Sequence, residues 1–355
     1  MIETNNVDSN REISKEEFLK EKFYLSFSSL GKLLSSPKIF YRDYILKERE
    51  ELEGKHLKEG ELLHCFVLEP ENFDDKFIVM PAKVPGGGLK IVIDNVFKTY
   101  AKPQIKKEEV CIIPDLEELH REILNELELQ DLYQTLVSAK RKDSDGLMLT
   151  ADQKRLQKVI TPETEIYWSA LIEGERKTIV DMDMVTKSKI KAQAILSTPK
   201  ALKLLTTNTI KTDVRKEVEL KCELSGYPFG LKGIIDCVLV DYENETIYIT
   251  DLKTTSKELK DWESSVDIYR YWLQAVIYKE LILALVPDDN NRPWKLKFNF
   301  IVVDKNNMVY TYPVSAQSLA LWELKAKEEY DKAKWHFDNH IYNLPYEYEL
   351  GLVEL

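Results

Sequence analysis

The sequence has few cysteines and no long apolar run, and each absence excludes a class of protein. Only four cysteines occur in 355 residues, and none belongs to a C-x-x-C pair: Cys65, Cys111, Cys222 and Cys237. A disulfide scaffold is therefore not expected, and a reducing compartment is the natural setting. The longest apolar stretch, around residues 278–286, is too short to cross a bilayer. Because the polar N-terminus also has no signal-peptide core, a cytoplasmic protein without membrane partners is expected.

An excess of positive charge is also absent. The formal net charge is −11, and the sequence pI is near 5.2. A protein that coats nucleic acid non-specifically is usually basic, so this balance argues against that role. It still allows an enzyme with a local basic groove, because affinity for nucleic acid depends on local phosphate contacts.

Periodicity and loop signals predict an α/β (α+β) fold with a mixed central sheet flanked by helices. Residues 1–22 are expected to form a flexible leader. Helices follow, one beginning near Ser26 and interrupted at Pro37 and another over 57–68, before PAKVPGGG breaks the pattern. The later elements have strand and helix patterns: strands at 218–224, 231–240, 246–252, 296–303 and 308–313, a buried helix over 266–286 and a final helix over 316–340.

Two acidic residues and a lysine lie on adjacent predicted strands. Asp236 ends GIID, and Asp251 and Lys253 in ITDLKTT are two residues apart, so their side chains leave the same face of a strand. If the strands form a meander, Asp236 lies beside Asp251, and the two carboxylates repel unless a divalent cation lies between them. Lys253 can then orient or deprotonate a water, or stabilise charge at phosphorus. The trio predicts phosphodiester hydrolysis, although a lone D-x-K pair is usually a solvated strand end.

A histidine and a polar stripe add to this set. His64 lies one helical turn after Gly60, whose missing side chain leaves room beside the imidazole; an ordinary core or surface histidine is the alternative. Tyr271, Gln274 and Tyr278 form a polar stripe on an apolar helix. This stripe can orient Lys253 or contact a phosphate, and ordinary burial of aromatic residues is the alternative.

Several segments together resemble the PD-(D/E)XK nuclease superfamily, and in particular the phage-type exonucleases akin to the catalytic domain of exodeoxyribonuclease VIII. LKEGELLHCFVLEP is similar to the G-x-x-x-H segment of that family, and YWLQAVIY to its Q-x-x-x-Y helix. The stretch from LKGIIDCV through ITDLKTT is similar to the catalytic core, and FNFIVVDKNNMVYTYPVS to the final hairpin.

The resemblance implies a role for each matching residue. His64, Asp236, Asp251 and the Leu252 carbonyl would bind Mg²⁺, for which Mn²⁺ could substitute, and Lys253 would be the catalytic lysine. Gln274 and Tyr278 would support the site, and Glu219 would bind a second metal. Lys232 lies where related sequences carry a basic residue that contacts DNA. Independently of the resemblance, the local basic residues Lys211, Arg215 and Lys216 are candidates for phosphate contacts, with a solvated face as the alternative, and Tyr271 is a candidate from the polar stripe. No iron–sulfur cluster is expected, because no cysteine follows Cys237.

The implied activity is a magnesium-dependent exodeoxyribonuclease that resects duplex DNA ends for phage-type recombination, in a bacterium or a phage-infected cell. An endonuclease of the same fold and a non-catalytic DNA-binding recombination factor stay open as alternatives. So do a single-strand annealing partner and a homo-oligomeric ring. Residues 23–355 are expected to form one nuclease domain with four parts: N-terminal helices with His64 (23–80), a mainly helical insertion (81–210), the catalytic sheet and helix (211–313), and a C-terminal helix and tail (314–355). The role of residues 161–190 is not assigned.

Overall fold

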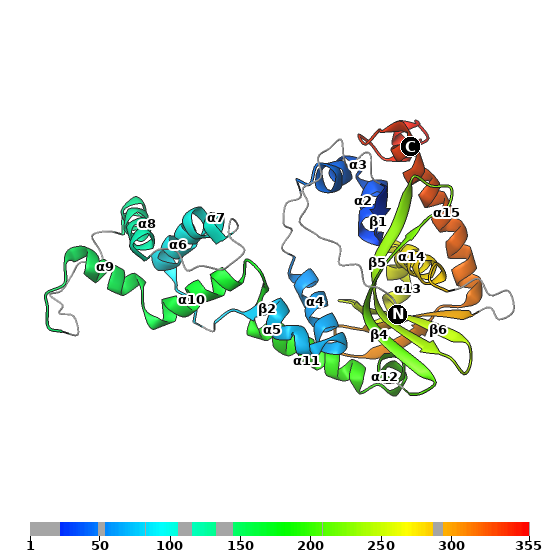
Figure 1. Ribbon diagram of the computed structural model, residues 1–355, viewed down its shortest axis with the longest axis horizontal. Coiled ribbons are helices and arrows are strands. Elements are labelled where there is room, and N and C mark those ends of the chain that lie inside the picture. The colour runs from blue at the N-terminus through cyan, green and yellow to red at the C-terminus, as the bar shows by residue number, and fades with distance from the viewer. Residues whose placement is uncertain are drawn as a thin grey trace. The chain divides into compact units, whose positions relative to one another are not determined.

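The computed structural model describes seven segments of the chain: residues 22–48, 54–81, 83–105, 116–132, 145–207, 209–286 and 294–354. The predicted leader, apart from Lys22, lies outside the described residues, as does Cys111. The chain divides into two compact units, which are drawn in Figure 1. Met1–Gly54 with Lys191–Leu355 is called the sheet unit here, and Lys55–Ile190 the helical unit. The expectation of a single nuclease domain stays a prediction.

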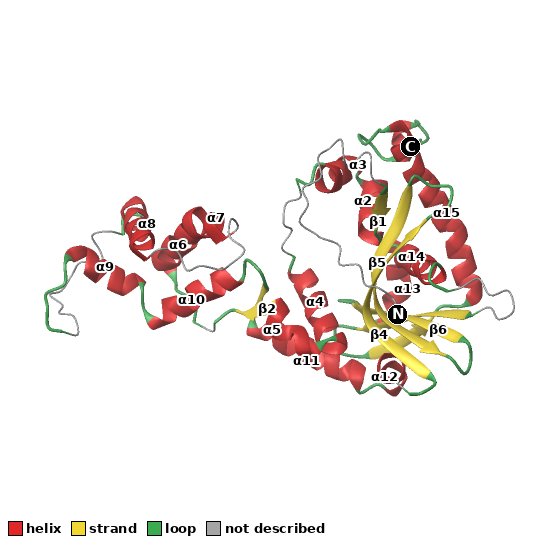
Figure 2. Ribbon diagram, in the orientation of Figure 1, coloured by secondary structure: helices red, strands yellow, loops and turns green. Residues whose placement is uncertain are grey.

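One mixed sheet forms the centre of the sheet unit. Its strands run in the order β1–β5–β6–β7–β8, and β4 also pairs with β5. The bounds are β1 (Phe23–Leu25), β4 (Thr212–Glu223), β5 (Phe229–Asp241), β6 (Thr246–Thr254), β7 (Lys295–Val303) and β8 (Val309–Pro313). Strands β4, β5 and β6 form an antiparallel meander, the condition on which the placement of Asp236 beside Asp251 depended, whereas β6 and β7 are parallel and are connected through helices. The predicted fold class, a mixed sheet flanked by helices, is confirmed (Figure 2).

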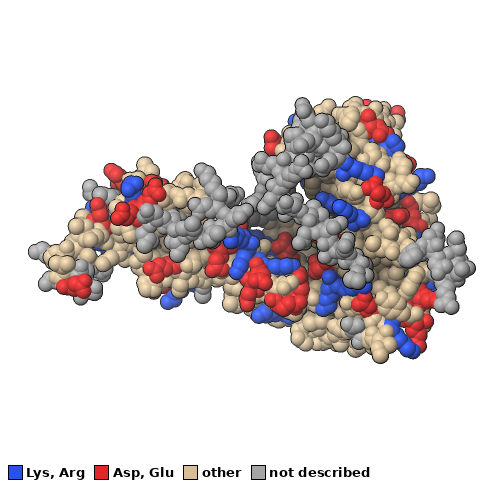
Figure 3. Space-filling model, in the orientation of Figure 1, with Lys and Arg blue, Asp and Glu red and all other residues tan. Residues whose placement is uncertain are grey.

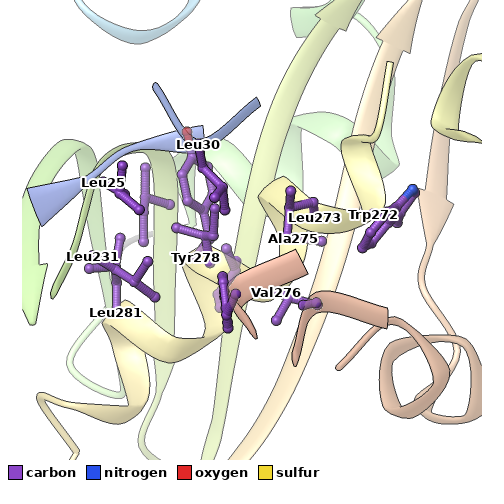
Figure 4. Packing of buried hydrophobic residues seen from close by; sticks show 14 of the residues in the cluster. Leu25, Leu30, Leu231, Trp272, Leu273, Ala275, Val276, Tyr278 and Leu281 are labelled. Carbon is purple, nitrogen blue, oxygen red and sulfur yellow. The ribbon is translucent and has the colours of Figure 1, made fainter. Parts of the chain in front are cut away.

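Helices cover the sheet, which is why its central strands are nearly continuous apolar runs. The last six residues of β7, FNFIVV, are all buried. Helix α14 (Tyr271–Leu283) contacts β4, β5 and β7, and its residues 272–278 are all buried, as its apolar sequence predicts. In Figure 4, Tyr278 and Leu281 of this helix lie beside Leu25, Leu30 and Leu231. Helices α2 (Phe27–Ser35) and α15 (Ala316–Asn339) pack against α14, and α12 (Pro199–Thr206) contacts β5 and β8.

One predicted element of this unit is wrong, and one observed strand was not predicted. The single helix predicted over 266–286 is two helices, α13 (Trp262–Ile268) and α14, because Arg270 between them has a left-handed backbone with φ of 55°. Arginine is not a residue that favours this conformation, so no residue pattern signals the break. Strand β1 was not predicted either, since its three residues become a strand only by pairing with β5, about two hundred positions later. The interruption at Pro37 is correct: α2 ends at Ser35, and α3 (Pro37–Phe40) and a π-helical turn (Tyr41–Ile45) follow.

The helical unit is mainly helical in its described part. Its helices are α4 (Lys55–Leu68), α5 (Phe73–Lys76), α6 (Gly87–Val96), α7 (Lys102–Ile105), α8 (Leu116–Leu129), α9 (Ala151–Val159), α10 (Pro162–Glu173) and most of α11 (Met182–Leu196), with short 3₁₀ and π turns at Pro70–Asn72 and Phe97–Ala101. Two unpredicted strands, β2 (Phe77–Val79) and β3 (Thr178–Val180), pair in parallel. Helices α6 to α10 are therefore inserted in the chain between the two paired strands β2 and β3. Among the described residues, no helix has both the length and the apolar character that a membrane span requires.

Gly230 provides a test of the packing between β1, β4 and β5. A Cβ added at this position would come within 2.5 Å of the Cys222 carbonyl oxygen and of the Tyr24 ring. Because backbone cannot move aside cheaply, we expect Gly230→Ala to lower the free energy of unfolding by about 1–3 kcal/mol. Gly31→Ala is the matched control: nothing lies within 4 Å of its added Cβ, so a gain of about 0.5–1 kcal/mol is expected from helix propensity. Denaturant unfolding of the full chain measures both, and a Gly230→Ala protein as stable as wild type would contradict this packing.

Candidate active site

The candidate site lies where β5 changes its neighbour on one edge. Strand β1 pairs with Phe229–Leu231 of β5, and β6 pairs with Cys237–Asp241. Because Cys237 is paired with Thr250, the next register position sets Asp236 opposite Asp251. The register thus brings together the two carboxylates that the sequence placed on neighbouring strands.

A third carboxylate stands on the other edge of β5. Lys216 and Val218 of β4 pair with Cys237 and Ile235, so Glu217 is at the register position opposite Asp236. Oxygen atoms of Glu217 and Asp236 lie within 4.8 Å of each other. Glu217, Asp236 and Asp251 therefore occupy one row across three adjacent strands.

Both β4 and β5 are irregular at this row. Ile235 and Val238 both belong to the core that includes α14, although regular alternation would turn residues 235 and 238 to opposite faces. The alternation of β5 therefore changes phase around Asp236. Beside it, Glu217 has a left-handed backbone with φ of 47°, which costs on the order of 1–3 kcal/mol for a residue other than glycine. Strain of this kind persists where the surrounding structure enforces it and is concentrated at functional sites.

Asp236 and Asp251 are both buried, but their surroundings differ. Oδ2 of Asp236 accepts a 2.6 Å hydrogen bond from the backbone N–H of Leu252. Oδ2 of Asp251 lies 2.5 Å from Nζ of Lys253, whereas its Oδ1 is buried and has no hydrogen-bond partner among the described residues. An unsatisfied buried carboxylate oxygen is costly, and a hard divalent cation is a group that satisfies it. The donor set therefore fits the metal that the sequence predicts.

Lys253 is held as a cation. Burial lowers the pKa of its ammonium, but the carboxylates of Asp251 and Asp236 raise that pKa by more, so it lies above the ordinary value. Lys253 therefore carries its proton at neutral pH and acts as a positive charge. Its Nζ also lies 4.8 Å from the ring centroid of Tyr271, a cation–π contact.

The predicted polar stripe of α14 faces these carboxylates. Nε2 of Gln274 donates a 2.9 Å hydrogen bond to the Tyr278 hydroxyl, and Oε1 of Gln274 is buried without a hydrogen-bond partner among the described residues. Burial raises the pKa of Tyr278 well above its usual value, and nearby Asp251, Asp236 and Glu217 raise it further. The hydroxyl therefore stays protonated and lies within the field of all three carboxylates.

Other predicted site residues lie outside this cluster. Glu219 is exposed and pairs with Ile234, and Lys232 is exposed and pairs with Lys221. The predicted DNA contacts Lys211, Arg215 and Lys216, on β4 and just before it, are exposed too. Two of them form ion pairs: Lys211 with Glu243 at 2.5 Å and Arg215 with Asp213 at 2.8 Å. On the face shown in Figure 3, basic side chains are interspersed with acidic ones. His64 is half-buried on α4 of the helical unit, and its role with the carboxylates stays a prediction.

Glu217 was missed in the sequence. The segment KEVELK offers two glutamates two positions apart, and regular alternation would put both on one face of the strand. The register opposite Asp236 and the positive φ single out Glu217. Only a structure contains either signal.

Comparison with known proteins identifies the family. The family model for the PD-(D/E)XK nuclease superfamily matches residues 116–346, and the chain belongs to that superfamily. Its members use divalent metal ions. No curated protein matches the chain. Among solved structures, the chain is similar to one described as a "Putative exonuclease" from Eubacterium rectale, with 12% identity, a TM-score of 0.44, and coverage of 94% of this chain and 87% of that one.

Metal binding can be tested by thermal stability. Mg²⁺ at about a hundred times its Kd should stabilise the wild type by about 2.7 kcal/mol, because it binds the folded state alone. Asp251→Asn and Glu217→Gln should each reduce the rise in Tm that Mg²⁺ produces, since each removes a carboxylate of the row. Glu219→Gln, an exposed change two residues from Glu217, should keep the full rise. Melting curves with and without Mg²⁺ check this. A full rise in Asp251→Asn, or a loss confined to Glu219→Gln, would show that the row does not bind the ion.

Proposed function

We propose that this chain is a magnesium-dependent exodeoxyribonuclease that resects duplex DNA ends, with Mn²⁺ able to replace Mg²⁺. The observation that supports it is the row of Glu217, Asp236 and Asp251 with the charged Lys253 on the same face. Three carboxylates and one ammonium, all partly or fully buried, are the parts that metal-assisted phosphodiester cleavage requires. The end-directed mode and the recombination setting rest on the resemblance to phage-type exonucleases.

In this proposal, Asp236, Asp251 and His64 hold the ion together with the Leu252 carbonyl. The second-metal role expected of Glu219 passes to Glu217, because Glu217 shares the row. Bound metal supplies Lewis acidity and an activated water. An annealing partner and a ring assembly remain expectations of the resemblance, and a cytoplasmic location remains an expectation of the sequence composition.

The chain's own residues then have separate tasks. The ammonium of Lys253 stabilises negative charge as it develops on the phosphoryl oxygens, and Tyr271 and Asp251 hold that ammonium in place. Gln274 has its amide nitrogen fixed by Tyr278, so its free carbonyl oxygen is oriented to accept a hydrogen bond within the site. Lys232, beside Lys221 on the exposed face of the sheet, is proposed to contact the phosphate backbone, as are Lys211, Arg215 and Lys216.

Lys253 is the residue whose removal tests the chemistry most directly. Lys253→Ala should lower the cleavage rate by roughly a hundredfold or more, because a preorganised charge is lost from the transition state. Lys295→Ala is the matched control: it removes an exposed lysine at the opposite end of the same sheet, where Lys295 pairs with Thr246. The assay is release of label from linear duplex DNA with Mg²⁺, with and without chelator. Similar rates for the two variants would refute the assignment.

The same assay separates the two modes of cleavage. An exonuclease degrades linear duplex and leaves closed circular DNA intact, whereas an endonuclease of the same fold cuts both. Binding of DNA without any metal-dependent cleavage of either substrate would instead identify a non-catalytic recombination factor.

His64 is tested against a second histidine on the same helix. His64→Ala should raise the Mg²⁺ concentration needed for half-maximal cleavage by about tenfold or more, since even the residues that support a metal ligand contribute about 10–100-fold to affinity. His56→Ala changes an exposed histidine at the start of α4 and should leave the requirement unchanged. Titration of Mg²⁺ in the cleavage assay gives the comparison. An unchanged requirement in His64→Ala would remove this residue from the ligand set.

A further inference from the structure

An exposed tyrosine lies next to the ring that contacts Lys253. Tyr269, in the link between α13 and α14, is 54% exposed, and its ring centroid is 5.6 Å from that of Tyr271. Tyr271 in turn holds Nζ of Lys253 at 4.8 Å. One aromatic contact therefore separates an open ring face from the proposed catalytic lysine.

The Tyr269 ring is presented by a rigid support. Tyr271 stacks on the buried Trp262 at 5.4 Å with an interplanar angle of 18°, and Trp262 packs against Phe300 of β7. The left-handed Arg270 turns the chain between the two tyrosines, and its guanidinium donates to Glu329 of α15 at 3.1 Å. Because the link is fixed at both sides, little conformational freedom is lost when a ligand covers the exposed ring.

Lysines lie in the segment before α13 and in the loop after β7. Lys257 donates to the Ser264 hydroxyl of α13, and Lys260 and Lys305 both pair with Glu258. This segment is tied to β8 by the Tyr312 hydroxyl, which donates to the Leu259 carbonyl at 2.8 Å. Aromatic and basic side chains thus both occur on residues 257–271, next to the proposed active site, and this is the composition of surfaces that bind single-stranded nucleic acid.

We propose that Tyr269 stacks on an unpaired nucleobase of the strand being cleaved, next to the phosphate that Lys253 addresses. The proposal rests on the proposed nuclease function and adds a positioning residue to it. Stacking does not depend on base identity, because every base offers a π face, so Tyr269 contributes affinity for an open strand without sequence preference. It also explains why a large apolar ring stays uncovered beside the site.

The test pairs a protein change with a substrate change. Each substrate is a linear duplex whose cleaved strand ends in three unpaired nucleotides, prepared for either strand polarity. In separate substrates one of the three nucleotides is abasic. If Tyr269 stacks on one of these bases, the wild type should cleave the matching abasic substrate with kcat/KM lower by roughly fivefold to a hundredfold. Tyr269→Ala should cleave the intact and abasic substrates at equal rates.

Two variants separate stacking from structural damage. Tyr269→Phe keeps the ring and should keep the wild-type discrimination. Tyr242→Ala removes a tyrosine that is 52% exposed and touches an aromatic ring, that of Trp294, at the turn between β5 and β6, and it too should discriminate as wild type does. A variant that is merely destabilised loses activity on all substrates equally.

Two results would overturn the proposal: a wild type indifferent to the abasic nucleotide at all three positions, or a Tyr269→Ala variant that discriminates as wild type does. A wild type that shows no metal-dependent cleavage of any substrate would refute the nuclease function itself. The two failures are therefore distinguishable.

Discussion

The hydrogen bond from the Leu252 amide to the Asp236 carboxylate is the contact on which the candidate site depends. The ladder between β5 and β6 ends at Cys237 and Thr250, so the N–H of Leu252 needs an acceptor other than a β5 carbonyl. Asp236 supplies one. In doing so its side chain reaches the strand that carries Asp251, and Lys253 lies within the electrostatic influence of both carboxylates.

Positive charge is provided in part by the protein itself. Lys253 neutralises one oxygen of Asp251 and leaves the other buried without a partner in the described structure. A buried ion pair of this kind seldom contributes much stability, because removing both charges from water costs about as much as their attraction returns. Its retention within a sheet covered by an apolar helix therefore favours a chemical role over a structural one.

Helix α14 connects the core to the site. Its buried apolar residues anchor it on the sheet, and the same rigid packing fixes Tyr271, Gln274 and Tyr278 along the carboxylate row. A polar residue on such a helix is costly unless it has partners. Gln274 and Tyr278 are partners of each other, and Tyr271 faces Lys253. The position of α14 on the sheet thus determines both the packing of the core and the placement of these three polar side chains.

The sequence by itself determined the local pattern of this protein: the strands that carry Asp236 and Asp251, the two-residue spacing that turns Asp251 and Lys253 to one face, and the helical spacing of Gln274 and Tyr278. These follow from side-chain period, which is a local property. Tertiary structure alone decided that Glu217 and not Glu219 is at the register position opposite Asp236, and it alone decided the break at Arg270 and the existence of β1. Each of these depends on pairing between distant segments or on a strained backbone that only surrounding contacts maintain, and no local pattern of residues encodes either.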